Sequence, residues 1–485
     1  MTYTLTLREE EFQQLQSVVF SAPRLEGAAY MLCSVSETDG ELRFLGREVI
    51  PVEQDHYLKR EPFVLSISSF SFTRVAKYAQ RNNLSVLFVH SHPGGLLEYS
   101  PQDDEEEQKL QAFLRSRIPA RIHGSLLLTE TGIIGRIFIG QFQKISRIRV
   151  MGSRFRFFDD DSGDYKHVPF FDRQVRAFGK DIQLQLQRLN VGVVGVGGTG
   201  SAVVEQLARL GVGTLSIFDG DHFDDSNVNR VYGSSATDSG IKKVDIAKRN
   251  VDRIGLGTLV LRYPKHITNE QVAKELRRCD VIFGCTDKQQ PRSILVQLAL
   301  RYLIPVIDTG VVIESAKGTI TDVVGRVTTL LAGEACLFCR KRITPQGIQL
   351  ESLSKEERAS LAREGYAPSL TPLLQRSCHS PAQLLHLRFQ SFSIASLAIW
   401  GAIVIRQSCF VSSTKIGYVL IDWNQTQIVF ALSEAYGGVA TRCRSSILRG
   451  GLSTRQFRFA VPRNVRRIFA HRPTDAESVF GHCGI

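Results

Sequence analysis

The chain has 485 residues, of which 43% are hydrophobic and 22% charged, proportions typical of a soluble globular protein. This length exceeds that of one ordinary hydrophobic core, so the sequence predicts two or three domains. No apolar run reaches the ~18 residues of a membrane span, and the start MTYTLTLREEEF lacks the pattern of a secretory signal. We therefore expect a cytoplasmic protein, whose nine cysteines are free thiols or metal ligands rather than disulfides.

The first 150 residues alternate short β-rich runs with polar helical stretches, a pattern typical of a compact α/β domain. The β-rich runs are 28–35, 84–92, 124–130 and 133–140, and the clearest helical stretch is 71–83. The segment that follows, 151–167, is polar and rich in acidic residues. We predict a first domain over 1–150 and a linker over 151–167.

Two histidines and an acid in the first domain have the spacing of a metal site. His90 and His92 lie on the same side of the extended end of a predicted strand. Asp103 lies at a predicted helix start that Ser100 caps. Two nitrogen ligands and one oxygen ligand with an open position describe a hydrolytic zinc site. Such a site also needs a general base, for which Glu26 is the candidate, and an oxyanion donor, which Ser100 can supply.

For the pair His90-x-His92 alone, chance is the favoured interpretation, and the acids could merely cap the helix. The complete string HSHPGGLLEYSPQD, with a glutamate far upstream, resembles the JAMM motif of the JAB/MPN metalloprotease family. Members with this motif intact are typically zinc peptidases that cut after the C-terminal glycine of ubiquitin-like proteins. The resemblance implies that both histidines and Asp103 hold zinc, that Glu26 is the base and that Ser100 stabilises the oxyanion. Glu48, another acid beside a predicted strand, remains an alternative base.

From 168 to 435, predicted strands and helices alternate in the βαβ manner. The strands are 190–196, 214–221, 281–287 and 305–311, and the helices include 200–211 and 240–254. This alternation predicts a Rossmann-like, doubly wound, mostly parallel sheet with helices on both faces.

A glycine-rich loop follows the first of these strands. Its glycines are Gly195, Gly197, Gly198 and Gly200. Glycines between a strand and a helix let phosphate groups approach the backbone and the helix N-terminus. Asp219 ends the next strand, where a ribose-binding acid belongs. Taken alone, these features would predict a dehydrogenase equally well.

The residues after Asp219 favour ATP over a nicotinamide cofactor. The segment concentrates amides and cations: Asn227, Asn229, Arg230 and Lys243. These groups suit a triphosphate and a departing pyrophosphate better than a nicotinamide. Asp287 ends a later strand and, with Asp219 or Asp221, could hold Mg²⁺.

The region from 170 to about 340 resembles the adenylation domain shared by ubiquitin-activating enzymes, ThiF and MoeB. The resemblance rests on a D-R-Q entry, the G-x-G-G-x-G loop, D-x-D-x8-R, a lysine thirteen residues after that arginine, and C-T-D. It implies the following roles: Asp219 binds ribose, Asn227, Arg230 and Lys243 bind phosphates, and Asp287 binds Mg²⁺. In family dimers an arginine equivalent to Arg173 reaches the neighbouring subunit's nucleotide, so a homodimer is implied. Lys288 and Val231 depart from the family pattern, which usually has asparagine and glutamine there.

The cysteines allow two further interpretations. Cys336 and Cys339 form half of a structural zinc site, but the second C-x2-C usual in the resembling family is missing. The single cysteines Cys378, Cys409, Cys443 and Cys483 could complete a second zinc site; otherwise the pair is a relic or a redox couple. Cys378, beside His379, could form a thioester, or it could be an ordinary loop residue.

Residues 436–485 contain nine arginines, no lysine and two acidic residues. A basic tail can attract nucleic acid or acidic protein surfaces. Because the tail lacks regularly spaced aromatic residues, we expect a solvated or partner-docking tail rather than nucleic-acid binding.

The two resemblances together predict a bifunctional enzyme of a ubiquitin-like pathway. Its central domain would adenylate the C-terminal glycine of a ubiquitin-like protein, and its first domain would cut after that glycine. The partners would be that protein and a conjugating enzyme. The alternatives are activation and trimming of a sulfur carrier for thiamine, cysteine or molybdopterin, and a non-catalytic scaffold. The architecture also resembles fused bacterial ubiquitin-like operon proteins, some of which are linked to phage defence.

Overall fold

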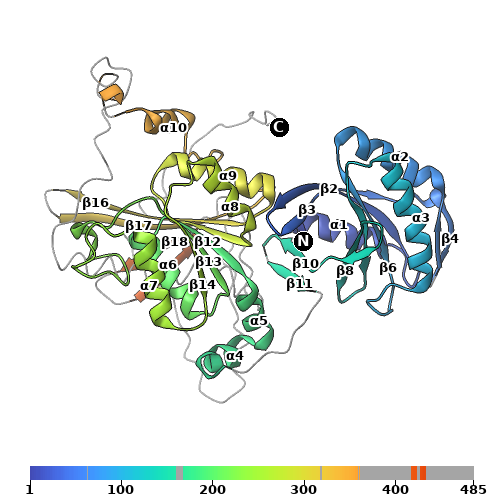
Figure 1. The fold of residues 1–485 in the computed structure, drawn as a ribbon, viewed down its shortest axis with the longest axis horizontal. Helices are drawn as coiled ribbons and strands as arrows, with labels where there is room; N and C mark the ends of the chain where they lie inside the picture. The colour runs from blue at the N-terminus through green and yellow to red at the C-terminus, as the bar shows by residue number, and fades with distance from the viewer. Residues whose placement is uncertain are drawn as a thin grey trace, which may run out of the picture. The chain divides into compact units, whose positions relative to one another are not determined.

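The computed structural model describes residues 1–62, 64–153, 155–159, 168–316, 319–354, 356–358 and 360, and the strands 417–422 and 427–432 (Figure 1). These residues belong to one compact unit, Met1–Ser433. Within it, the structure contains a nine-stranded and a six-stranded sheet. The mixed α/β class predicted from the sequence is therefore confirmed.

The nine-stranded sheet has the strand order β11-β10-β1-β3-β2-β6-β7-β8-β9. Its strands are β1 (Thr2–Arg8), β2 (Ala28–Thr38), β3 (Glu41–Pro51), β6 (Ser85–Ser91), β7 (His123–Leu128), β8 (Ile133–Phe138), β9 (Phe142–Lys144), β10 (Arg147–Met151) and β11 (Arg156–Asp159). Strand β1 runs parallel to β10 and β3, and β6 runs parallel to β7, whereas the other pairs are antiparallel. A separate hairpin is formed by β4 (Tyr57–Glu61) and β5 (Val64–Ile67), after the short 3₁₀ helix Gln54–His56.

Helices cover both faces of this sheet. They are α1 (Glu9–Val19), α2 (Ser69–Asn82) and α3 (Pro101–Arg117). Along β2, Ala29 and Met31 pack in the core cluster that contains α1, whereas Tyr30 and Leu32 pack in the cluster that contains α2 and α3. Because successive strand side chains point to opposite faces, a strand buried on both faces reads as a continuous apolar run.

Part of the predicted linker is a strand. Residues Arg156–Asp159 form β11, which pairs antiparallel with β10 at the edge of the nine-stranded sheet. Phe157 and Phe158 pack against different core clusters, so their side chains alternate as in other strands. The acidic residues around this short apolar stretch mask its strand character in the sequence. The remaining residues of the predicted linker, 160–167, lie outside the described part.

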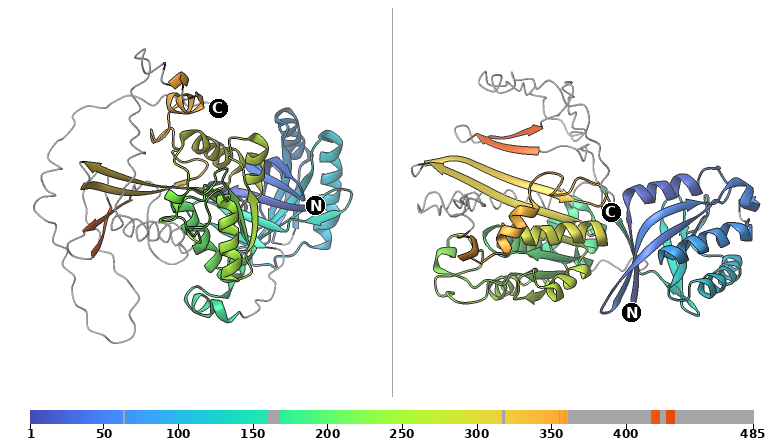
Figure 2. Two further views of the ribbon diagram at one scale, coloured as in Figure 1. Left: turned by 60° about the vertical axis from the view of Figure 1, so that its left-hand side comes forward. Right: turned by 90° about the horizontal axis from the view of Figure 1, so that it is seen from above.

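The six-stranded sheet has the order β14-β13-β12-β15-β16-β17. Its strands are β12 (Asn190–Val194), β13 (Thr214–Phe218), β14 (Leu259–Tyr263), β15 (Val281–Gly284), β16 (Val306–Ala316) and β17 (Thr319–Leu330). All neighbours from β14 to β16 are parallel, and only β17 is antiparallel. The predicted mostly parallel sheet is thus observed, with β16 and β17 forming a long hairpin that projects beyond the other strands (Figure 2).

Helices also lie on both faces of the second sheet. Its helices are α4 (Asp172–Phe178), α5 (Lys180–Arg188), α6 (Gly198–Arg209), α7 (Lys243–Ile254), α8 (Glu270–Glu275) and α9 (Gln289–Tyr302), with 3₁₀ turns at Pro169–Phe171, Asp225–Asn227 and Leu276–Arg278. Apolar residues of α6 and α7 share one core cluster, and those of α8 and α9 share another. The remaining elements are α10 (Pro345–Ser352), β18 (Gly417–Asp422) and β19 (Gln427–Leu432).

The strand order fixes where a ligand site belongs in this sheet. From β12 the chain builds outward through β13 to β14, and then β15 returns to the other side of β12. The carboxyl ends of β12 and β15 therefore meet at the switch point, where open α/β sheets bind their ligands.

None of the described helices is long and apolar enough to cross a membrane.

Candidate functional site

The first site is built at the end of β6. His90 and His92 alternate with Ser91, whose buried side chain faces the other way. The Ser91 hydroxyl donates to the carbonyl of Val19 (3.0 Å) and accepts from the backbone N–H of Gly27 (3.0 Å). These two bonds tie the segment that carries Glu26 to the strand end.

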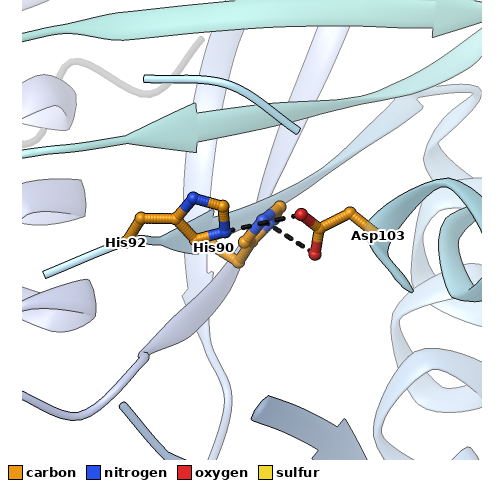
Figure 3. Close-up of side chains that lie close together, drawn as sticks. All are labelled: His90, His92 and Asp103. Atoms are coloured by element: carbon orange, nitrogen blue, oxygen red, sulfur yellow. Dashed lines mark ion pairs between the residues drawn. The ribbon is translucent and has the colours of Figure 1, made fainter. Parts of the chain in front are cut away.

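His90, His92 and Asp103 converge, and their nearest ligand atoms all lie within 4.8 Å of one another (Figure 3). The Nε2 atoms of His90 and His92 each lie 3.4 Å from one Asp103 oxygen. His90 is buried, and its Nε2 lacks a hydrogen-bond partner among the described residues. An unpartnered buried nitrogen, a second imidazole and a carboxylate form a donor set that fits zinc.

The start of α3 fixes the position of Asp103. The Ser100 hydroxyl oxygen accepts from the Asp103 backbone N–H (3.2 Å), and the Asp103 carboxylate accepts from the Ser100 N–H (2.7 Å). Ser100 and Asp103 thus make a capping box, and Pro101 occupies the first turn. The helix-cap and ligand interpretations of this acidic run are therefore compatible. The Ser100 hydroxyl keeps its own proton available for donation.

Two glutamates were candidates for the general base, and the structure separates them. Glu26 is buried, with its Oε1 4.0 Å from His92 Nε2. Glu48 is exposed on β3 and accepts a hydrogen bond from Tyr78 (2.9 Å). Only Glu26 of the two lines the cavity beside the three ligand candidates. Burial raises the pKa of Glu26 to about 7, although the two histidines oppose this shift.

The charges of the three ligand candidates are strongly coupled. For His90, burial lowers the pKa, but the neighbouring carboxylates of Asp103 and Glu107 outweigh it and raise the pKa to about 9. For Asp103, burial raises the pKa, but both histidines and the Ser100 N–H hold it well below its usual value. Without a metal, the cluster therefore favours a proton on His90 and an ionised Asp103, so metal binding must release that proton.

A cavity of about 120 Å³ opens beside the cluster. Its polar side is formed by Glu26, His90, Ser100 and Asp103. Its apolar side is formed by Tyr30, Leu65, Ile67, Phe72, Phe88 and Leu110. The cavity thus combines apolar walls with a few convergent polar groups, as ligand sites commonly do.

Sequence reasoning missed the residues behind His90. Glu107, Ser125 and Arg136 are buried and hydrogen-bonded to one another. They come from α3, β7 and β8, so their sequence separation gives no pattern. The one available signal was that Glu107 lies four residues after Asp103, hence on the same helix face.

The second site is built on the glycine loop between β12 and α6. Gly195 has a φ of +86°, and a Cβ there would lie 2.7 Å from the carbonyl oxygen of Cys285, after β15. At Gly200 a Cβ would lie only 1.7 Å from the Gly195 carbonyl oxygen. A Cβ at Gly197 would meet nothing within 4 Å. The loop therefore packs tightly against the switch point on one side and is open at Gly197.

The carboxylate of Asp219 holds this loop. One oxygen accepts from the backbone N–H of Val196 (2.8 Å) and the other from that of Asp221 (2.9 Å). Asp219 directly follows β13 and is buried. Its position suits a ribose contact, which stays a prediction, and it also has a structural role that the motif does not reveal.

The predicted phosphate-binding cations lie near the loop. The Cδ of Arg230 lies 3.3 Å from where a Gly198 Cβ would be, so this side chain lies over the start of α6. The Arg230 guanidinium donates to the Ser226 carbonyl (2.7 Å) and approaches the side-chain oxygen of Asn229 (3.4 Å). Lys243 begins α7 and donates to the Asp221 carboxylate (2.9 Å).

The remaining predicted ligands lie around the same loops. Asn227 is buried in a 3₁₀ turn, and Asp287 is exposed in the loop after β15. For Asp221, burial raises the pKa, but Lys243, His266 and Lys288 outweigh it and lower the pKa. The unusual Lys288 thus acts electrostatically on this edge of the sheet. In the described part of the chain, Asp219, Asp221 and Asp287 do not form a metal-ligand cluster.

A buried carboxylate beside this edge was also missed. Asp308, on β16, accepts from Arg326 (2.7 Å) and lies 3.1 Å from Arg292 Nε. Asp308 is almost fully buried. The two arginines leave one positive charge in excess of the carboxylate. Burial lowers the pKa of Arg292, and the charges of Asp308 and Asp287 oppose this shift. The Arg292 guanidinium therefore interacts electrostatically with Asp287.

Other predicted residues are placed as follows. Arg173 is exposed on α4. The Cys336 and Cys339 sulfurs lie 3.7 Å apart, and hydrogen bonding to Cys336 lowers the pKa of Cys339. Val231 packs in a small buried apolar cluster, which explains an apolar residue where the family usually has glutamine. The four single cysteines Cys378, Cys409, Cys443 and Cys483 lie outside the described residues.

Known proteins resemble part of the chain. The chain is 30% identical over 156 residues to the adenylyltransferase and sulfurtransferase UBA4 of Meyerozyma guilliermondii, covering 30% of this chain and 37% of that protein. It is 32% identical over 166 residues to UBA4 of Debaryomyces hansenii, covering 33% and 34%. The chain thus spans little more than a third of the length of these relatives.

Solved structures also align with part of the chain. The crystal structure of E. coli MccB with ATP aligns with a TM-score of 0.39 and 17% identity, covering 56% of this chain and 73% of that one. E. coli tRNA N6-threonylcarbamoyladenosine dehydratase TcdA with ATP aligns with a TM-score of 0.29 and 24% identity, covering 30% and 61%. The ThiF family matches residues 171–413, which are 243 of the 485 residues. The chain therefore belongs to the ThiF family.

Proposed function

We propose that the chain is a bifunctional enzyme of a ubiquitin-like pathway. It adenylates the C-terminal glycine of a ubiquitin-like protein and cleaves polypeptides after that glycine. The observation that carries the proposal is the convergence of His90, His92 and Asp103 beside Glu26, in a chain that belongs to the ThiF family. The N-terminal α/β region over 1–150 is proposed to be a JAB/MPN domain, followed by an adenylation domain over 168–435 and a basic tail over 436–485.

In the adenylation reaction, the terminal carboxylate of the partner attacks the α-phosphate of ATP. An acyl–phosphate bond forms, the bond between the α- and β-phosphates breaks, and pyrophosphate leaves. The α6 N-terminus and the glycine loop receive the phosphates, and Arg230 and Lys243 stabilise the charge on the departing group. Mg²⁺ would neutralise further phosphate charge, with Asp287 as the candidate ligand. Arg173 from a second copy is proposed to complete the site.

In the cleavage reaction, zinc bound by His90, His92 and Asp103 would acidify a water molecule and polarise the scissile carbonyl. Glu26 lies close enough to the cluster to accept the proton of the attacking water and later pass it to the leaving amine. The Ser100 hydroxyl, whose proton is not used in the helix cap, donates to the oxyanion. The apolar side of the cavity excludes water and holds part of the substrate.

A second function, activation and trimming of a sulfur carrier, is favoured by one observation. The relatives from Meyerozyma guilliermondii and Debaryomyces hansenii are described as adenylyltransferases and sulfurtransferases. The adenylation chemistry is the same in both functions, and they differ in what receives the activated glycine.

The test is ATP–pyrophosphate exchange with a panel of glycine-terminated ubiquitin-like and sulfur-carrier proteins, followed by a non-reducing gel. Exchange that depends on Lys243, with a thiol-sensitive adduct lost in Cys378→Ala, supports the conjugation pathway. Exchange without an adduct favours sulfur transfer or direct handover. The absence of exchange with every partner contradicts the activating function.

A further inference from the structure

A buried carboxylate lies directly behind the first histidine of the zinc candidate site. Glu107 lies on α3 one helical turn after Asp103, with only 3% of its surface exposed. Its Oε1 atom lies 3.3 Å from Nδ1 of His90. Nε2, on the other side of the same imidazole, lies 3.4 Å from Asp103. The ring is thus held between two carboxylates of one helix.

The two oxygens of Glu107 have different surroundings. Oε2 accepts from the Ser125 hydroxyl and from both Nε (3.0 Å) and Nη2 (2.7 Å) of Arg136. Oε1 and His90 Nδ1 lie 3.3 Å apart, and neither atom has another hydrogen-bond partner among the described residues. The three donors on Oε2 leave Oε1 as the acceptor for His90.

Arg136 itself is held on several sides. Its guanidinium lies 3.7 Å from the ring centre of Tyr99 and 3.8 Å from that of Phe142, and it pairs with Asp104. Contacts with two rings fix the plane of the guanidinium, so its Nε and Nη2 donors point toward Glu107. The Glu107 carboxylate is therefore oriented before any metal binds.

We propose that Glu107 is a positioning residue that keeps the His90 proton on Nδ1, so that the Nε2 lone pair faces the metal. This inference rests on the proposed zinc peptidase. Histidine ligands commonly donate their other N–H to a carboxylate or carbonyl, which fixes the ring and increases its basicity. His92 uses the weaker arrangement, because its Nδ1 lies 3.4 Å from the backbone carbonyl of Leu96.

Glu107→Gln is the informative variant because it keeps the size of the side chain and changes only its chemistry. The three donors from Ser125 and Arg136 will hold the amide oxygen, which turns the NH₂ group toward His90. Nδ1 must then accept, and the imidazole proton moves to Nε2, where it blocks metal ligation. Glu105→Gln is the matched control, since Glu105 lies on the same helix, is exposed and, among the described residues, pairs with Lys109 alone.

The experiment measures the zinc affinity of the full chain by competition with a chromophoric chelator, with circular dichroism to check folding. We expect Glu107→Gln to bind zinc roughly 10- to 100-fold more weakly than the unmodified chain. Glu105→Gln should bind with the affinity of the unmodified chain. A folded Glu107→Gln protein that binds zinc as tightly as the unmodified chain overturns the positioning role and leaves the peptidase proposal intact. An unmodified chain that binds no zinc overturns both.

A second measurement does not use the Glu107→Gln variant. In the zinc-loaded chain labelled with ¹⁵N-histidine, the resonances of His90 are assigned by their loss in His90→Gln. The proposal predicts a proton on Nδ1 and metal on Nε2. A proton on Nε2 with the metal on Nδ1 contradicts it.

Discussion

At the level of single residues, the proposed cleavage depends on which glutamate is the general base for the bound water. Glu26 is buried near the histidines, whereas Glu48 is exposed and occupied by Tyr78. We expect Glu26→Gln to slow cleavage of a ubiquitin-like fusion by about 10² to 10⁴-fold, the usual contribution of a general base, while zinc stays bound. Cleavage rates and metal content of the purified variant measure both effects.

The control for this prediction is Glu48→Gln, which should cleave at the rate of the unmodified chain. Loss of cleavage in Glu48→Gln together with full activity in Glu26→Gln would reverse the assignment of the base.

The sequence predicted the residues that would contact the ligands of both sites better than the buried residues that hold them in place. His90, His92 and Asp103 fall at a fixed spacing because one strand end and one helix start carry them. The buried Ser125 and Arg136 come from two later strands, and only the folded sheet brings them behind His90. A local sequence pattern can reveal only residues that are close together along the chain. Buried residues that reach a site from distant strands therefore leave no motif.

At the scale of elements, the glycine loop offers a matched pair of substitutions. A Cβ at Gly200 would lie 1.7 Å from a backbone oxygen, whereas a Cβ at Gly197 has open space around it. We expect Gly200→Ala to destabilise the chain by roughly 1–3 kcal/mol, the usual cost of overpacking, and to abolish ATP binding. Gly197→Ala should leave stability unchanged. Thermal unfolding and nucleotide titration of both variants test this, and equal stability of the two would contradict the packing.

The end of α3 and the start of β7 predict a pH dependence. Burial lowers the pKa of His123 to about 4, against the effect of a contact with the Ile118 carbonyl, and the ring Nδ1 accepts from the Val86 N–H (3.0 Å). The folded chain thus favours neutral His123, while in the unfolded chain the imidazole has a pKa of about 6.5. Its contribution to stability is complete above about pH 6.5 and is lost as the pH falls toward 4.

The size of this loss is at most about 3.5 kcal/mol, because the two pKa values differ by about 2.5 and each pKa unit corresponds to about 1.4 kcal/mol. The measurement is the pH dependence of the first denaturant-induced transition in the unmodified chain and in His123→Asn. The variant should lose the part of the slope between pH 6.5 and 4 that His123 supplies. An unchanged slope would assign the acid sensitivity to other groups.

Element types were predicted more reliably than element ends. The predicted helix 240–254 begins only at Lys243, because Gly240 has a φ of +81° and a bridge between His222 and Lys242 keeps the preceding residues extended. The short strands β11 and β14 were missed, since their exposed or charged residues hide a brief apolar pattern. The antiparallel β17 was missed because the hairpin pairing depends on β16 rather than on local alternation.

At the scale of the whole molecule, the resemblance to ThiF-type proteins is confirmed by the family match, and the JAB/MPN assignment stays a prediction. The two proposed activities use separate residues, so they should be separable. We expect 1,10-phenanthroline, which removes zinc but not Mg²⁺, to abolish cleavage and leave ATP–pyrophosphate exchange with a mature partner intact. Lys243→Ala should do the reverse and reduce exchange by about 10²-fold or more, as loss of a charge-stabilising group does. Parallel loss of both activities under either treatment would contradict independent sites.

The central claim is that one chain both exposes and activates the same terminal glycine. The most direct measurement follows a ubiquitin-like precursor that carries a short extension after its glycine, by intact mass spectrometry and pyrophosphate exchange in one reaction. We expect the extension to be lost first and exchange to begin only after this cleavage. We expect Glu26→Gln to block cleavage, and to block exchange until mature partner is added. Exchange with the uncut precursor, or a partner that is cut but never activated, would contradict it.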